Sequence, residues 1–189
     1  MDHLTLYTSQ TDTVLEVLHR DGVCFNRERY IRSKYRQDSE GFLAVYRSFI
    51  ANAASIVAPP EGAEFPYWAF AQTSELFVGC SSHVLKLAVP RDQAVLFDLY
   101  DWNRMLQMRL LNPEEPREKA FLKELKLRGL TVRDVMTTPF YPELRQSVLD
   151  SWNALLRHHE ALLHGDASGV GGIQAGLWQL REEWIVEER

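Results

Sequence analysis

The segment 165–185, which reads GDASGVGGIQAGLWQLREEWI, constrains the fold of this chain more than any other stretch. Its first half places four glycines among small and polar residues, which indicates a flexible loop, because glycine reaches positive φ at little cost. From Ile173 onward apolar and polar residues alternate, which predicts a strand with two distinct faces. Gln174 would then stand where the loop becomes a sheet, an arrangement that suits either a binding site or an ordinary strand after a loop.

Length and composition predict a single globular domain over 1–189. The chain has 189 residues, 46% of them hydrophobic and 25% charged, which is enough for a continuous core. The formal charge of −5 argues against nucleic-acid or membrane binding through the global field, although a local basic patch remains open. No apolar run reaches membrane-spanning length and Met1 leads into a strand-like segment, so we expect a cytoplasmic protein without membrane contact. Cys24 and Cys80 lack metal-ligand spacing, so neither a zinc site nor a disulfide framework is expected.

The pattern along the chain mixes strands and helices. Alternating or aromatic stretches predict strands at 4–9, 65–72, 83–89 and 173–180. Helical spacing predicts a helix that Thr11 or Asp12 caps and Gly22 ends, and further helices at 41–57, 113–128 and 144–164. After the strand at 83–89 we expect a turn and then, over 95–106, a strand or a helix start. Because the regular alternation and glycine fingerprint of a doubly wound fold are missing, we expect an α+β fold.

One basic and aromatic segment, RERYIRSKYR at 27–36, stands out in this acidic chain. It could contact phosphates while its tyrosines stack on bases or on a nicotinamide ring. The alternative is a solvated surface segment, which is what most charge runs are. Its members are Arg27, Arg29, Tyr30, Arg32, Lys34, Tyr35 and Arg36.

Three other groups of residues carry open alternatives. The aromatic strand FPYWAFAQ is either plain core or the wall on which a flat ligand stacks. Asp98 and Asp101 could act as acids, bases or magnesium ligands, or simply form a turn and cap a helix. A metal site at His158, His159 and His164 is one interpretation. Surface and interface histidines are the favoured one, because neighbouring positions on a helix point in different directions. We therefore predict no metal.

The order of five segments resembles an uncharacterised bacterial domain family of unknown function over nearly the whole chain. These segments are LYTSQ, FPYWAF, VLKLAVPRDQAVLFDLYDWNRML, LRQSVLDSWNALL and IQAGLWQLREEWI. The wider arrangement resembles the ADP-ribosyltransferase superfamily, particularly the bacterial toxins that modify nucleic acids. That resemblance implies a split β-sheet core with surrounding helices, and NAD as substrate. It places GDASGVGG at the target-recognition loop and IQAGLWQLREEWI at the strand that opens with the catalytic glutamate.

The resemblance also implies a site, with two departures from the family pattern. Gln174 stands at the position of the catalytic glutamate, and Thr8 stands at the position of the first-strand His or Arg. A glutamine still accepts a hydrogen bond from a ribose hydroxyl but brings no negative charge. We predict Gln174, Thr8 and Tyr67 as the catalytic group, in a groove between the strands 4–9 and 173–180. The predicted NAD contacts are Tyr7, Thr8, Gln10, Arg29, Arg32, Tyr35 and Trp68.

Three explanations of the missing glutamate follow. The site could use the group of Thr8, Tyr67 and Gln174 as it stands, take a carboxylate from Asp98, Asp101 or Glu143, or bind a nucleotide without catalysis. The first function predicted is an NAD-dependent ADP-ribosyltransferase that modifies RNA, DNA or protein as a toxin or phage-defence component, with an antitoxin protein as partner. The alternatives are a non-catalytic nucleotide-binding or protein-interaction module and a hydrolase that uses Asp98 and Asp101.

Overall fold

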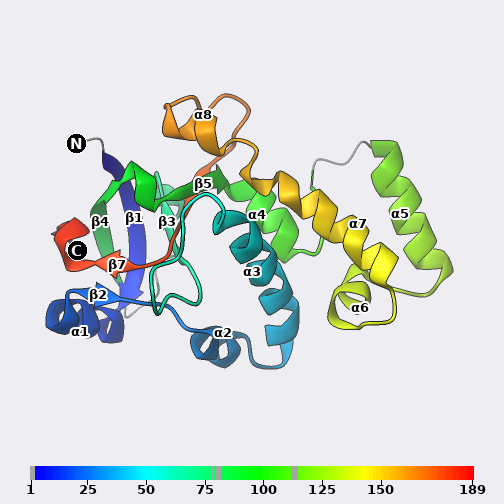
Figure 1. Ribbon diagram of the computed structural model, residues 1–189, viewed down its shortest axis with the longest axis horizontal. Coiled ribbons are helices and arrows are strands. Elements are labelled where there is room, and N and C mark those ends of the chain that lie inside the picture. Colours follow the sequence, from blue (N-terminus) through cyan, green and yellow to red (C-terminus); the bar gives the residue numbers. More distant parts are fainter. Residues whose placement is uncertain (1–2, 78, 80–81, 112–114) are drawn as a thin grey trace.

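The computed structural model describes residues 3–77, 79, 82–111 and 115–189, which form α-helices and an antiparallel sheet (Figure 1). The strands are β1 His3–Thr11, β2 Val23–Cys24, β3 Tyr67–Phe70, β4 Ser82–Pro90, β5 Val95–Asp98, β6 Ile173–Leu177, β7 Leu180–Arg181 and β8 Ile185–Glu188. The helices are α1 Asp12–Asp21, α2 Glu28–Tyr35, α3 Ser39–Ala53, α4 Leu99–Leu106, α5 Glu115–Leu127, α6 Val132–Thr137, α7 Pro142–Trp152 and α8 His159–Leu163. The predicted mixture of helices and strands is confirmed.

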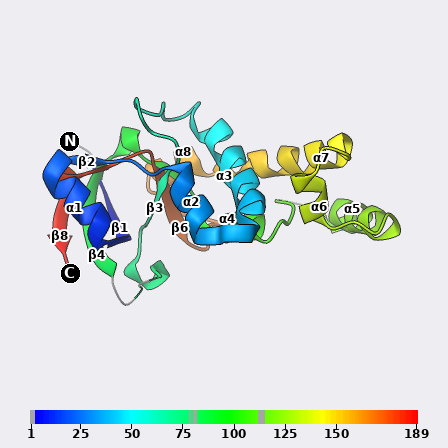
Figure 2. The same cartoon turned by 90° about the horizontal axis from the view of Figure 1, so that it is seen from below.

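Within the described residues, six strands form one sheet in the order β5-β6-β3-β1-β4-β8, and every pair is antiparallel. β1 and β4 pair along their whole length, from His3 opposite Pro90 to Thr11 opposite Ser82. β1 and β3 pair only where Tyr7 lies opposite Phe70. The sheet therefore opens beyond this pair, with β1 and β4 on one side and β3 and β6 on the other (Figure 2).

Two hydrophobic clusters cover the sheet. The first joins β5 to α3, α4 and α7 through buried residues such as Phe49, Phe97, Trp102 and Trp152. The second joins β1, β4 and β6 to α1 through buried residues such as Leu6, Leu18, Leu85 and Leu177. Helices α5 and α6 lie away from the sheet at the right of Figure 1, and α7 runs from them back toward β5.

The strand predicted at 173–180 is shorter than expected. β6 ends at Leu177, and the chain then bends so that Leu180 pairs with Cys24 in a separate two-stranded sheet, β2-β7. Trp178 fixes the bend, because its indole Nε1 donates to the carbonyl oxygen of Val57 at 2.6 Å. Alternation alone could not reveal this break, since the partner of the buried indole lies in the turn after α3, far away in the sequence.

The helix predicted at 144–164 is also interrupted. α7 ends at Trp152, residues 153–156 form a 3-10 turn, and α8 packs separately on β5. Asn153 holds the turn against α3, because its Oδ1 accepts a hydrogen bond from Asn52 Nδ2 at 3.0 Å. The interruption lets His159 reach β5, where its Nδ1 accepts a hydrogen bond from the Leu96 amide at 3.0 Å. Burial lowers the pKa of His159, and the prediction of a satisfied interface histidine is confirmed.

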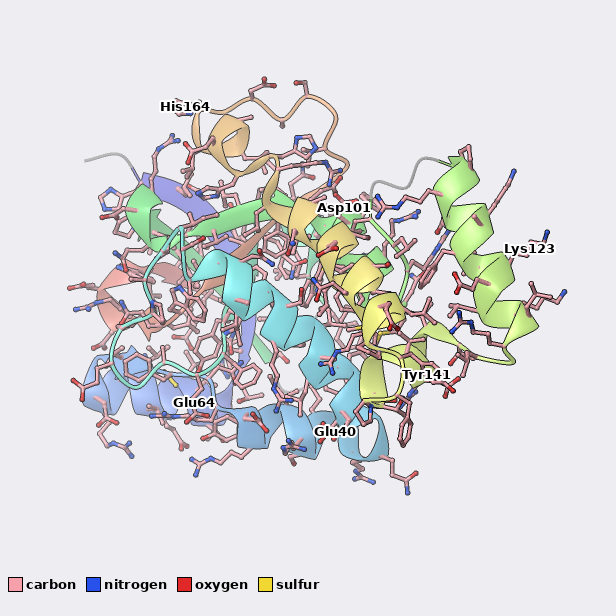
Figure 3. All side chains as sticks on the ribbon, turned by 45° about the vertical axis from the view of Figure 1, so that its right-hand side comes forward. Glu40, Glu64, Asp101, Lys123, Tyr141 and His164 are labelled. Carbon is pink, nitrogen blue, oxygen red and sulfur yellow. The ribbon has the colours of Figure 1, made fainter. Side chains whose placement is uncertain are left out.

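The remaining helix predictions are confirmed with adjusted bounds. The surface helix predicted at 113–128 is α5, of which Phe121 and Leu125 are buried while Leu122 and Leu127 are exposed; residues 113–114 lie outside the described part of the chain. Lys123, labelled in Figure 3, points away from the rest of the molecule. The segment 95–106 is β5 followed by α4. No described helix combines the length and the apolar character needed to cross a membrane.

Candidate functional site

A cavity of about 820 Å³ lies where the sheet opens between β1 and β3. α1, α2 and α4 and the segment 75–77 complete its walls. Its volume falls within the range of small-molecule sites, roughly 300–1,000 Å³. The polar residues of its lining include Thr8, Gln10, Asn26, Lys34, Glu75 and Gln174. Its aromatic residues include Tyr30, Tyr35, Tyr46, Tyr67, Trp68 and Trp102.

Trp68 is the centre of the aromatic wall. Its indole Nε1 donates to the Tyr46 hydroxyl at 2.9 Å, and its ring centroid lies 4.6 Å from that of Trp102. Phe49 and Phe97 meet the Trp68 ring edge to face from the core side. Burial raises the pKa of the Tyr46 hydroxyl, so this group stays protonated at neutral pH. The wall is therefore a rigid, uncharged surface on which a flat ring can stack.

Thr8 bridges the opening of the sheet. Its Oγ1 donates to the Trp68 carbonyl oxygen at 2.8 Å and accepts from Gln10 Nε2 at 2.7 Å. The hydroxyl thus supplies part of the pairing that the β1 and β3 backbones do not make here. Thr8 and Gln10 both line the cavity, but the Thr8 hydroxyl already has two partners and shapes the site.

Tyr67 lines the cavity on β3 with its hydroxyl beside a thiol. The Tyr67 hydroxyl oxygen lies 3.0 Å from Cys24 Sγ. Burial, together with the Cys24 neighbour, raises the pKa of Tyr67. The hydroxyl is therefore neutral at physiological pH and can act as a hydrogen-bonding group but not as a phenolate base.

Gln174 is buried at the start of β6, opposite Phe70 on β3 and Phe97 on β5. Only 2% of its surface is exposed, and its Oε1 has no hydrogen-bond partner. A buried acceptor without a donor costs free energy, on the order of 1–3 kcal/mol, and such an acceptor is rare in a native protein. Gln174 is also one of the residues that line the cavity.

Glu75 brings a carboxylate into the same cavity, and sequence reasoning missed it. It lies in the 3-10 turn Thr73–Glu75 after β3, and its Oε2 is buried without a hydrogen-bond partner. Burial raises the pKa of the Glu75 carboxyl, and the Asp98 carboxylate adds to this shift. The sequence QTSEL gives no periodic or motif signal for such a role; the turn after the aromatic strand was the available clue.

The basic segment at 27–36 forms α2, and only part of it reaches the cavity. Tyr30, Lys34 and Tyr35 line the cavity. Arg29 and Arg32 are not among the lining residues. The Arg32 guanidinium pairs with Glu28, at 2.6 Å, and with Glu40, which Figure 3 labels at the start of α3.

Two further predictions about the groove meet a different geometry. Tyr7 lies on β1 but does not line the cavity. The groove was predicted between the strands 4–9 and 173–180, but β3 lies between β1 and β6, so the opening is between β1 and β3. An aromatic strand from the middle of the sequence thus separates the two segments, which alternation cannot predict because strand order depends on long-range packing.

The three carboxylates considered from the sequence lie outside the cavity lining. Asp98 caps α4, because its Oδ1 accepts from the Tyr100 amide at 2.9 Å, and its Oδ2 accepts from the Gly171 amide at 3.4 Å. Asp101, labelled in Figure 3, is buried and lies 2.6 Å from Arg157 Nη1. Glu143 is exposed in the first turn of α7. Asp98 and Asp101 therefore have structural partners.

The described residues contain no cluster of three or more His, Cys, Asp or Glu side chains that could hold a metal ion. His164 Nδ1 lies 2.7 Å from the Glu160 carbonyl oxygen of its own helix, while His159 is buried against β5.

The chain belongs to the family described as Domain of unknown function (DUF3841), which matches residues 5–186. The match covers nearly the whole chain, so the sheet, the cavity and the helices around them are parts of this one family domain. No curated protein and no solved structure matches the chain significantly.

Proposed function

We propose that this domain binds NAD in the cavity between β1 and β3 and transfers ADP-ribose to a macromolecule. The observation that carries the proposal is Gln174, a buried polar residue near the start of β6 that lines the cavity and whose Oε1 has no hydrogen-bond partner. This oxygen suits a ribose hydroxyl, and the aromatic wall around Trp68 suits a nicotinamide or adenine ring.

We assign the parts of NAD to three regions of the cavity. Trp68 and Trp102 offer stacking surfaces, and Gln174 accepts a hydrogen bond from the nicotinamide ribose. Lys34, at the exposed end of α2, supplies a positive charge for the diphosphate. The acceptor is RNA, DNA or a protein, and the activity is that of a cytoplasmic toxin or phage-defence component held in check by an antitoxin protein.

A non-catalytic nucleotide-binding module is the second candidate. Gln174 favours it, because a neutral amide cannot stabilise the cationic sugar that forms as nicotinamide leaves. The two candidates make the same contacts with NAD and differ only in turnover.

Incubating the purified protein with NAD labelled in the adenine, and with total RNA, DNA or lysate, tests the proposal. We expect NAD to bind, free nicotinamide to be released, and label to appear in one class of macromolecule. Binding without nicotinamide release under any condition would favour the non-catalytic module. Absence of NAD binding in calorimetry would overturn both candidates.

Lys34→Gln is expected to weaken NAD binding about fivefold and to reduce its dependence on salt. The reason is that attraction between the ammonium and the diphosphate is screened as ionic strength rises, with a Debye length of about 10 Å at 0.1 M salt. Calorimetric titration at 50 and 500 mM NaCl measures both effects.

Arg29→Gln is the matched control, because Arg29 lies on the same helix but outside the cavity lining, where its guanidinium stacks on the Tyr30 ring. Its affinity and salt dependence should equal those of the unmodified protein. If Arg29→Gln lost more NAD affinity than Lys34→Gln, the phosphates would instead lie on the outer side of α2.

A further inference from the structure

The Glu75 carboxyl occupies the space of a missing side chain next to Gln174. Gly172 directly precedes β6, and its carbonyl oxygen accepts from the Leu99 amide at 2.9 Å, which continues the pairing of β5 with β6. Alternate residues of an extended chain share a face and lie about 7 Å apart, so position 172 adjoins Gln174 on that face. A Cβ at Gly172 would overlap Glu75 Oε1. Because Gly172 has no side chain, the Glu75 carboxyl can lie against it.

Two residues that line the cavity each carry a buried acceptor without a donor. The acceptors are Gln174 Oε1 and Glu75 Oε2, and neither has a hydrogen-bond partner. Buried polar atoms are almost always paired, so a place with two unpaired acceptors favours a ligand that carries neighbouring hydroxyl donors. A ribose carries two such hydroxyls on adjacent carbons, and each can donate one hydrogen bond.

We propose that Glu75 is the catalytic carboxylate of this site and that it receives, together with Gln174, the hydroxyls of the nicotinamide ribose. This inference rests on the proposed function. Gln174 orients the sugar through its amide oxygen, and Glu75 provides the negative charge that Gln174 lacks. A carboxylate beside the sugar stabilises the cationic ribose as it forms.

The transfer of ADP-ribose needs no protein group besides these two residues. The bond between ribose C1′ and nicotinamide N1 breaks, and its electron pair stays on N1, so that nicotinamide leaves as a neutral molecule. The attacking atom of the macromolecule forms a new bond to C1′, and its proton passes to the Glu75 carboxylate. Burial raises the pKa of this carboxyl, which makes the carboxylate a better proton acceptor.

Glu75→Gln provides the test, with NAD affinity measured by calorimetry and nicotinamide release measured by chromatography. We expect affinity within about threefold of the unmodified protein and release at least about 100-fold slower, in the range found when one charge-stabilising group is removed. Adding Gln174→Glu to this variant returns a carboxylate to the site, and release should recover at least about tenfold. Glu61→Gln, an exposed glutamate outside the cavity, is the matched control and should release nicotinamide at the unmodified rate.

Gly172→Ala is a second variant that leaves Glu75 in the chain but expels its carboxyl from this place. It should also slow release about 100-fold. Normal release in Glu75→Gln, while the unmodified protein binds and cleaves NAD, would overturn the role of Glu75 and leave the proposed function standing. If the unmodified protein releases no nicotinamide with any acceptor, the proposed function fails and the assignment of Glu75 fails with it.

Discussion

Gln174→Ala is expected to reduce nicotinamide release about 100-fold and NAD affinity about tenfold. The alanine removes the buried oxygen that orients the ribose, and loss of one positioned polar group in a dry site typically costs about 10²–10³ in rate. The free energy of unfolding should change by less than about 1 kcal/mol, because Gln174 Oε1 has no protein partner to lose. Single-turnover release, calorimetry and urea unfolding measure the three quantities.

Gln174→Glu should retain or increase nicotinamide release, because a carboxylate at this position stabilises the cationic sugar. It should also lower stability, since a second carboxylate then lies beside Glu75 in a buried place. Gln37 is an exposed glutamine outside the cavity, so Gln37→Ala serves as the control and should leave nicotinamide release and stability unchanged. Unchanged release in Gln174→Ala would contradict the assignment of Gln174 to the ribose.

Trp68→Ala is expected to lower the free energy of unfolding by about 3 kcal/mol and to abolish measurable NAD binding. Truncation of a packed tryptophan leaves a cavity among Phe49, Phe97 and Trp102, and such substitutions cost roughly 3–5 kcal/mol when the ring is fully buried. Trp68 is half-buried, so the low end applies. For a chain of this length the melting temperature should fall by about 6–12 °C.

Two variants separate packing from stacking in this result. Trp68→Phe keeps an aromatic ring but loses the hydrogen bond to Tyr46, so it should cost about 1 kcal/mol and retain weak NAD binding. Phe140→Ala removes an aromatic side chain that is 77% exposed and should change stability by less than about 0.5 kcal/mol. Equal losses of NAD binding in Trp68→Phe and Trp68→Ala would show that binding depends on the indole hydrogen bond and not on the ring.

Local sequence patterns predicted the elements of the sheet well. Alternation identified β1, β4 and the first part of β6, because the pleat places successive side chains on opposite faces whatever the rest of the chain does. Gly22, at φ 73°, ends α1 as predicted, since this backbone conformation favours glycine. The same local rule failed at Trp178, where a hydrogen bond to Val57 ends β6 early.

The candidate site was predictable only in part. Thr8, Tyr67, Trp68 and Gln174 line one cavity, as expected from their places on the predicted strands. Glu75 could not be predicted, because its carboxyl takes the space left by the missing side chain of Gly172, a residue far along the chain.

The sequence alone determined that this chain builds an α+β domain whose strands carry aromatic and small polar side chains, and that Gln174 lies near the start of a strand after a glycine loop. Only the tertiary structure decided that β3 separates β1 from β6, that the sheet opens beyond Tyr7 and Phe70, and that Glu75 lines the same cavity as Gln174. The physical reason is the distance along the chain between the residues that decide each feature. Strand and helix patterns arise from the backbone geometry of neighbouring residues, whereas strand order and cavities depend on which distant faces pack together.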